Sequence, residues 1–393
     1  MLSIKGKGVW IKLLAMIVIF LCIKSVYTQY AQSQNRDNLF VLQSQAFLQQ
    51  RLDIQTPHLD AAPFEGKFYV PFPPFPSILL LPFVYIFGSE HTSTILVSTF
   101  LTLLNIYVLF SLLKQQELEN WIVNWSLMGF FLGTGYWYAL QWSGNVWFFA
   151  HIVAVSCLLL AMHEAFGKGR GWLTGIYLGS AILSRQLTLF ALPFLLVALW
   201  QNKKDLKNLG MTFIPLVLWG CFYLWLNWAR FHEPLDTGYS YLPLEDPLKA
   251  HFEKYGLFNL AYLPFNVIYL FFQGFHVEFN PPDYIKPHCL DPFGTSLTFA
   301  SPFVFIAFWA RKSPLLISAA WISITLMILI SLLYYANGFY QLNTQRFTLD
   351  YLPLLIFLVA LGTRKVNETL FKVLISYSIF MNVLTHVLCH KGS

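Results

Sequence analysis

Two arginines of this chain lie where charge is unfavourable. Arg185 separates two hydrophobic runs, and Arg346 ends a polar segment directly before another apolar run. A guanidinium in such surroundings must pair, reach water or bind an anion, and its planar fork can hold two phosphate oxygens. Alternatively, Arg185 extends to the membrane interface from a helix end, and Arg346 pairs with Asp350 one helical turn later. Under the first interpretation, a lipid phosphate is the ligand.

Carboxylates and imidazoles occur mainly in the polar segments. Asp37 precedes a stretch of helical periodicity and can serve there simply as the helix N-cap, while His58 and Asp60 follow that stretch. His151 lies in an apolar run and is expected to be a helix-packing residue. A later group could in principle hold a metal, but its spacing matches no tight ligand pattern; its members are His276, Glu278, Asp283 and His288. The sequence therefore leaves room for a divalent metal without indicating one.

Composition decides which elements must position these side chains. Of 393 residues, 56% are hydrophobic and 11% are charged, and the 38 Phe, 20 Tyr and 13 Trp together outnumber the charged residues. Soluble domains carry about 25% charged residues, so this chain needs lipid as a second solvent. The same figures exclude a disordered chain. The net charge of +6 is not clustered as nucleic-acid binding requires, so no nucleic-acid partner is expected.

Apolar runs that can cross a bilayer as helices recur along the chain, about eleven in all. The expected fold is all-α: a polytopic transmembrane helical bundle that forms a single integral membrane domain over residues 1–393. The runs are 9–27, 92–113, 121–140, 144–166, 172–184, 187–200, 210–230, 297–310, 315–335, 347–362 and 370–388. The fifth and sixth are short and could form a hairpin that stops partway. The first is expected to be a retained helix, and 76–88 and 257–275 are expected to be interfacial or re-entrant.

Lysine and arginine determine the expected orientation. With the N-terminus in the cytoplasm, the short loops that carry most of the basic residues fall inside, as bacterial and eukaryotic membrane proteins prefer. The long polar segments then form outer loops at 28–91, 231–296 and 336–346, and the first of them contains juxtamembrane helices. We therefore expect a multi-pass protein of the plasma or inner cell membrane with an exoplasmic active site.

The order of these features resembles the GT-C superfamily of membrane glycosyltransferases, in particular the branch related to protein mannosyltransferases and aminoarabinose transferases. The resemblance covers nearly the whole chain, although each motif alone is loose. It is carried by the early Asp37, by Gly66-Lys67-Phe68-Tyr69 with Pro71-Phe72-Pro73-Pro74, by Ser184-Arg185-Gln186, by Asn227-Trp228-Ala229-Arg230-Phe231, and by Gln345-Arg346-Phe347.

The resemblance implies transfer of a sugar from a polyprenyl-phosphate-linked donor to a hydroxyl of a glycan, lipid or protein acceptor, usually with inversion. Asp37 would be the general base and Asp60 a second carboxylate, because many relatives carry an acidic pair where this chain has Asp37 and Asn38. Further roles are implied for two sets: Arg346, Arg185 and Lys67 would hold the donor phosphate, and Tyr69, His58 and Gln345 would shape the substrate pocket.

Two other classes of protein compete with this interpretation. A transporter or flippase of a lipid-linked or small polar solute would also explain the spans and Arg185. However, it needs gates on both faces, whereas the polar length lies on one, and the two halves of the sequence show no symmetry. A non-catalytic scaffold has no use for Asp37, Arg185 and Arg346 placed toward one side.

Overall fold

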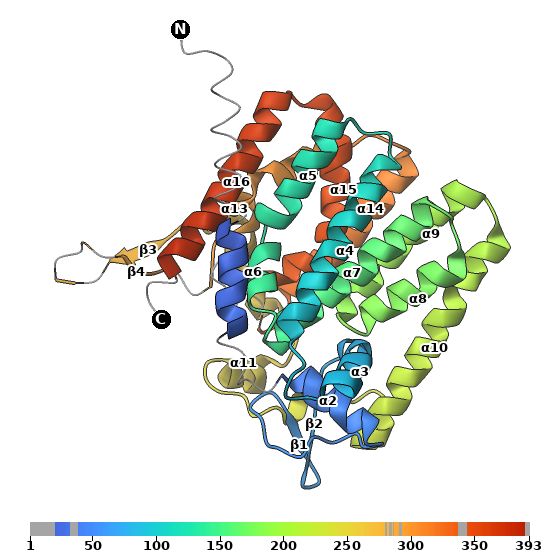
Figure 1. The fold of residues 1–393 in the computed structure, drawn as a ribbon, viewed down its shortest axis with the longest axis vertical. Coiled ribbons are helices and arrows are strands. Elements are labelled where there is room, and N and C mark those ends of the chain that lie inside the picture. Colours follow the sequence, from blue (N-terminus) through green and yellow to red (C-terminus); the bar gives the residue numbers. More distant parts are fainter. Residues whose placement is uncertain are drawn as a thin grey trace.

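The computed structural model describes residues 20–31, 38–279, 281–282, 285, 287–290, 293–336 and 344–389, and these residues are mostly helical (Figure 1). In that part of the chain, five helices are long and apolar enough to cross a bilayer. They are α4 (Thr94–Lys114), α7 (Val146–Phe166), α10 (Leu206–Phe231), α14 (Pro314–Leu332) and α16 (Glu368–Cys389). The expectation of a multi-spanning helical protein is confirmed at this level, and the number eleven stays a prediction.

Four of the predicted spans are not continuous α-helices, which corrects the sequence interpretation. The run 121–140 divides into α5 (Asn120–Leu132) and α6 (Tyr136–Gln141), and the run 187–200 divides into the 3₁₀ helix η1 (Gln186–Ala191) and α9 (Leu192–Lys203). The run 297–310 divides into α13 (Leu297–Ala300) and the 3₁₀ helix η5 (Pro302–Trp309). The run 347–362 divides into the 3₁₀ helix η6 (Arg346–Asp350) and α15 (Leu352–Gly362). Proline stands at the start of α9, η5 and α15. Because proline has no amide hydrogen and crowds the preceding turn, a helix tends to restart at it.

The core of the bundle lies around α7 and α15. In α7, 83% of the most apolar 18-residue stretch is buried, and every residue of α15 is buried. Helix α10 differs, because only 17% of its most apolar 18-residue stretch is buried and it stands at the edge of the bundle (Figure 1). A helix that is apolar all round must be covered by protein or by lipid, so the exposed face of α10 is suited to lipid.

A row of glycines brings α8 (Gly171–Ile182) against α10. A Cβ atom on Gly171 would lie 1.9 Å from the backbone oxygen of Asn208, and one on Gly175 would lie 2.2 Å from that of Thr212. Glycines at four-residue spacing share one helix face and let two backbones approach closely, as in many membrane helix pairs. From the sequence this stretch was predicted only as a short apolar run, so its tight packing against α10 is a finding of the structure.

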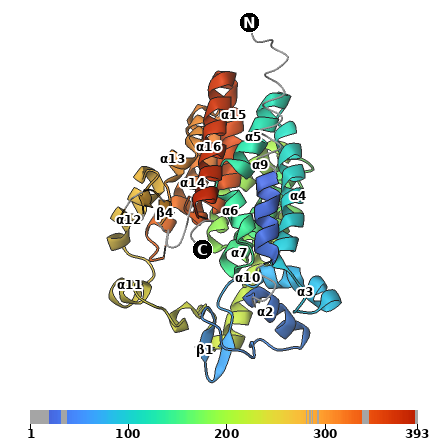
Figure 2. The ribbon, with the colours of Figure 1, turned by 60° about the vertical axis from the view of Figure 1, so that its left-hand side comes forward.

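One end of the bundle, here called the loop end, carries most of the small elements (Figures 1 and 2). These are α2 (Leu39–Leu48), the antiparallel hairpin β1 (Ala62–Phe64) and β2 (Lys67–Tyr69), α3 (Phe75–Phe87) and α11 (Leu248–Tyr255). The chain then continues through η3 (Leu260–Tyr262), α12 (Leu263–Val267) and the π-helical η4 (Ile268–Phe272), and forms a second hairpin, β3 (Val277–Phe279) and β4 (Pro287–Leu290). The hairpins make the fold mostly α rather than all-α.

The stretches 76–88 and 257–275, which were not predicted to span the membrane, form short helices. Helix α3 has 13 residues and packs against α2, and the second stretch is broken into η3, α12 and η4. Neither reaches the roughly 20 residues that a spanning helix needs. Their interfacial or re-entrant placement stays a prediction.

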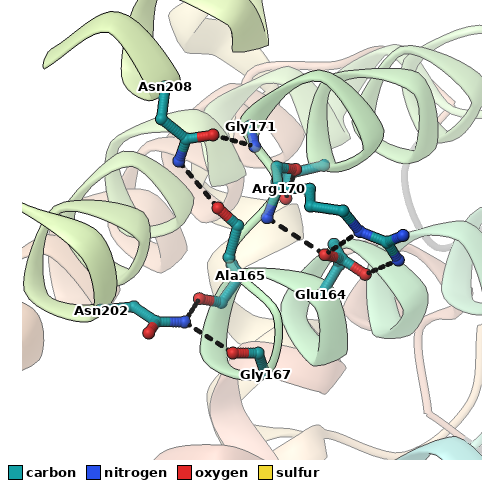
Figure 3. Close-up of polar contacts among 9 residues, drawn as sticks. Glu164, Ala165, Gly167, Arg170, Gly171, Asn202 and Asn208 are labelled. Atoms are coloured by element: carbon teal, nitrogen blue, oxygen red, sulfur yellow. Dashed lines mark hydrogen bonds and ion pairs between the residues drawn. The ribbon is translucent and has the colours of Figure 1, made fainter. Parts of the chain in front are cut away.

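The opposite end, here called the turn end, consists of short connections that bind one another. The Asn202 amide donates to the backbone oxygens of Ala165 and Gly167, at 2.9 Å each, and holds the turn after α9 against the turn after α7 (Figure 3). Arg364, in the 3₁₀ turn η7 (Thr363–Lys365), donates to the backbone oxygen of Gln116, 2.9 Å away, in the turn after α4. Four of the basic short loops that were predicted to share one side of the membrane therefore contact one another in two pairs at this end.

Candidate active site

A buried carboxylate joins three distant parts of the chain near the loop end. Asp350, at the end of η6, lies opposite Arg185, which donates from Nε to Oδ1 at 3.2 Å and from Nη2 to Oδ2 at 3.0 Å. The Nδ1 atom of His151, on the second turn of α7, lies 3.0 Å from the same Oδ1. The side chains of Asp350 and His151 are fully buried, and that of Arg185 is 21% exposed.

Local structure explains how Arg185 reaches this carboxylate. The residue lies between α8 and η1 in an extended conformation, with φ −145° and ψ 106°, so the helix cannot continue through it. Its side chain turns inward to Asp350 instead of extending to the membrane surface. The alternative interpretation of Arg346 had Asp350 as its partner; in the structure the carboxylate of Asp350 pairs with Arg185, which is 165 residues away in the chain.

The two arginines meet at one aromatic ring. The guanidinium carbon of Arg185 lies 4.7 Å from the ring centroid of Phe347, and that of Arg346 lies 5.3 Å from the same centroid. Arg346 also lies 5.1 Å from the ring of Trp147 at the start of α7. Aromatic faces attract cations, so these rings help to hold two like charges near each other. Because two guanidiniums share the neighbourhood of a single carboxylate, this group of side chains favours an anion.

A cavity of about 310 Å³ opens beside this group. It is lined by Asn38, His58, Asp60, Gly144, Asn145, Val146 and Trp147. Trp147 thus belongs both to the cavity and to the platform under Arg346. The lining combines an aromatic face with carboxylate, amide and imidazole groups, a mixture that can bind a ligand carrying several hydroxyls.

Asn38 is the N-cap of α2. Its Oδ1 atom accepts a hydrogen bond from the Phe40 amide at 2.9 Å, and its Nδ2 atom donates to the Gly144 oxygen at 2.7 Å. The capping role predicted for Asp37 therefore belongs to the next residue. Asp37 itself lies outside the described residues, and in the chain it directly precedes a residue that lines the cavity.

Asp60 is a carboxylate of the cavity wall with an altered acidity. Burial raises the pKa of its carboxyl above the ordinary value, and attraction to His58 and Arg346 opposes that shift in part. The Asp60 amide donates to Nδ1 of His58 at 3.0 Å, which leaves the imidazole proton on Nε2 when His58 is neutral. A carboxylate with a raised pKa in a cavity is a candidate for proton transfer.

Gln345 is buried next to Arg346 with an exposed fraction of only 2%. Neither atom of its side-chain amide has a hydrogen-bond partner in the part of the chain that the structure describes. Buried polar groups are usually paired, because leaving one unpaired costs about 1–3 kcal/mol. The amide is therefore suited to a polar ligand, but Gln345 is not among the residues that line the cavity, so its place in a substrate pocket stays a prediction.

Two predicted site residues lie elsewhere. Lys67 is exposed beside the turn of the β1–β2 hairpin and is absent from the lining of the cavity. Tyr69 packs edge-on against Phe231 of α10, with 5.5 Å between ring centroids, in a small cluster of its own. The structure thus brings Arg185 and Arg346 together at Phe347, with Gln345 next to Arg346 in the chain. It brings His58 and Asp60 together in the wall of the cavity. Lys67 and Tyr69 belong to neither group.

Sequence reasoning missed the roles of His151 and Trp147. His151 was predicted to be a helix-packing residue, yet it faces the carboxylate of Asp350, which lies 199 residues later in the chain. An imidazole inside an apolar run could have suggested a buried partner, since such groups seldom lie unpaired in a membrane helix. In the described residues, no three His, Cys, Asp or Glu side chains lie close enough to hold a metal ion. Asp283 lies outside those residues.

No family model and no curated protein matches this chain. Among solved structures, it is similar to the crystal structure of ArnT from Cupriavidus metallidurans bound to undecaprenyl phosphate, with 14% sequence identity and a TM-score of 0.48. The alignment covers 89% of this chain and 60% of that protein, so the chain spans about three fifths of the length of ArnT.

Proposed function

We propose that this protein is a membrane glycosyltransferase that moves a sugar from a polyprenyl-phosphate-linked donor to a hydroxyl of a glycan, lipid or protein acceptor. The observation that supports this most is the convergence of Arg185 and Arg346 at Phe347, beside a cavity that contains Asp60. Cations that hold a phosphate, next to a carboxylate that can take a proton, are what such a transfer needs.

The donor phosphate would bind between the two guanidiniums. All side-chain hydrogen bonds recorded for Arg185 use Nε and Nη2 toward Asp350, so its Nη1 group is left for a ligand in the described structure. As the bond between the anomeric carbon and the phosphate oxygen breaks, negative charge grows on the leaving phosphate. Positively charged donors already in place stabilise that charge more than they stabilise the intact donor.

The sugar would occupy the cavity, with Trp147 as an apolar wall. An acceptor hydroxyl attacks the anomeric carbon from the side opposite the phosphate, which inverts that carbon, and it passes its proton to a carboxylate. The family resemblance assigns the base to Asp37, and Asp60, which lines the cavity, is the second candidate. The raised pKa of Asp60 makes it a stronger base than an ordinary carboxylate once it is ionised.

The orientation proposed for the site is exoplasmic. The contacts among the turns at the turn end support this orientation, since short loops rich in Lys and Arg remain in the cytoplasm. The test is labelling of intact cells that express variants with one added cysteine in a cysteine-free background. We expect labelling at Gln55 and none at Asn202, and the opposite result would reverse the proposed orientation.

The test of the proposed activity uses purified protein in lipid nanodiscs. Polyprenyl-phosphate sugars extracted from the native membrane are incubated with envelope glycans, and products are identified by mass spectrometry with and without the protein. We expect sugar transfer together with release of polyprenyl phosphate. Movement of the donor across a vesicle membrane without a product would instead support the flippase interpretation.

A further inference from the structure

Asp350 links three segments that are far apart in the sequence. Arg185 comes from the break between α8 and η1, His151 from α7, and the carboxylate itself from η6. The carboxylate is 1% exposed, and the imidazole belongs to the most deeply buried of the long helices. Such a carboxylate is unfavourable unless it is fully paired, so its surroundings constrain its position strongly.

The geometry of the pair fixes the direction of the Arg185 side chain. Two parallel contacts, 3.2 Å and 3.0 Å long, define the plane of the guanidinium, and the Phe347 ring lies 4.7 Å from its central carbon. The Nδ1 atom of His151 lies 3.0 Å from Oδ1 and occupies the space beside that oxygen. In the described structure these contacts use one donor of Nε and one of Nη2, which leaves both donors of Nη1 and the second donor of Nη2 without a partner.

We infer that Asp350 and His151 are positioning residues for the donor phosphate. Asp350 sets the plane of the Arg185 guanidinium, and His151 holds Asp350, so that the phosphate meets an edge that is already oriented. Groups that stabilise developing charge act best when they need no reorganisation during the reaction. This inference rests on the proposed function, because it assigns roles within the same anion site.

Charge alone predicts the opposite effect of removing Asp350. The carboxylate neutralises one of two cations, so its loss should strengthen the binding of any anion if only charge mattered. If Asp350 acts by positioning, its loss should weaken binding, because Arg185 then has no fixed direction. The sign of the change in affinity therefore distinguishes the two roles.

The experiment measures binding of sugar-free polyprenyl phosphate to the full-length protein in nanodiscs, by the fluorescence of its tryptophans. We expect Asp350→Asn to weaken binding about tenfold or more, the loss that follows from a disrupted charge-assisted contact. Arg185→Ala should weaken it similarly, and the double variant should be no weaker than Arg185→Ala alone. Tighter or unchanged binding by Asp350→Asn, or fully additive losses, would overturn the inference.

The matched control is Glu164→Gln at the turn end, which disrupts a bidentate contact of the same kind with Arg170. It should leave the affinity for polyprenyl phosphate unchanged, and an equal loss there would show that Asp350→Asn acts only through stability. If Asp350→Asn does not fold, the inference is tested by comparing the affinities of two His151 variants for polyprenyl phosphate. We expect His151→Asn, whose amide can approach Oδ1, to retain binding better than His151→Leu, and equal binding by these two variants would remove His151 from the positioning role.

Because these measurements use a lipid without sugar, they remain informative if the proposed reaction is wrong. A wild-type protein that binds polyprenyl phosphate but transfers no sugar would contradict the proposed function and leave the positioning inference to be judged by the variants. A wild-type protein that does not bind polyprenyl phosphate would overturn both.

Discussion

The two ends of the bundle each contain an arginine with two contacts to a carboxylate, and the two pairs differ in how they are made. At the turn end, Arg170 donates from Nε and Nη2 to Glu164, at 2.8 Å each, across six residues of chain (Figure 3). At the loop end, Arg185 and Asp350 are 165 residues apart. The first pair closes a turn and the second joins separate parts of the fold.

Exposure separates the pairs further. The Arg170 side chain is 42% exposed, and an ion pair with such access to solvent adds little to stability. The side chain of Asp350 is fully buried, where desolvation can exceed the attraction between the charges. A buried ion pair is thus weak evidence for stability, which agrees with the positioning role inferred for Asp350.

Neighbouring polar groups show the same contrast. At the turn end, Asn202 and Asn208 satisfy the backbone oxygens of the turn between α7 and α8 (Figure 3). Near the loop end, the Gln345 amide is buried without a partner in the described residues, and a cavity is lined in part by the polar side chains of His58 and Asp60. The side-chain contacts to the turn indicate a structural region, whereas a buried unpaired amide close to a cavity indicates a ligand.

The largest effect is expected from the carboxylates of the loop end. Asp37→Asn should lower the rate of sugar transfer by roughly 10²–10⁴, because an amide cannot accept the proton of the acceptor hydroxyl. Since Asn38 is the N-cap of α2, this change should not remove the cap. The measurement is turnover with a polyprenyl-phosphate sugar, with thermal stability as a parallel check.

Asp60→Asn is the internal comparison for Asp37→Asn. We expect a smaller loss than for Asp37→Asn if the family assignment of the base holds. A larger loss in Asp60→Asn would move the base to the cavity carboxylate that the structure shows, and full activity of both variants would exclude both residues from proton transfer.

A smaller effect is expected from Arg346. Arg346→Ala should weaken binding of the donor about tenfold to a hundredfold, because a charge-assisted contact to phosphate is lost, and Arg346→Lys should restore only part of it. The measurement is donor affinity in nanodiscs. Arg170→Ala, which removes an arginine from the turn end, is the control and should not change it; equal losses in the two variants would remove the distinction between the ends.

At the turn end the expected effect is on stability. Asn202→Ala removes two hydrogen bonds to backbone oxygens and should lower the free energy of unfolding by about 1–3 kcal/mol. Thermal unfolding in detergent, compared with donor affinity of the same variant, checks this. Weakened donor affinity without a loss of stability would contradict the assignment of this end to structure.

The smallest effect concerns the pH dependence of stability at Asp60. Burial raises the pKa of this carboxyl in the folded protein, so the ionised form is disfavoured by folding. Below the unfolded pKa the carboxyl is protonated in both states, and its penalty appears as the pH rises through the folded pKa. Asp60→Asn should therefore stabilise the protein slightly at neutral pH and not at low pH. A stabilisation that grows as the pH falls would contradict the raised pKa.

The prediction from sequence was most accurate where the physical cause is local. The hydrophobic content of runs such as 144–166 requires a bilayer or a buried core, and the structure forms α7 there. Prolines such as Pro193, Pro302 and Pro353 could also have indicated where helices restart, because their effect on the backbone is local. The breaks were missed because hydropathy was weighed above proline position.

The partners of charged residues depended on the tertiary structure. Sequence proximity suggested Asp350 for Arg346, yet Arg185 and His151 occupy that carboxylate because the packing of α7, η1 and η6 brings them together. The cavity likewise combines residues from segments that no periodicity relates, such as Asp60 and Trp147. Composition and spacing thus determined that this chain is a helical membrane protein with cations near one end. Only the packing of helices decided which groups those cations meet, since contacts between distant residues follow from the fold as a whole.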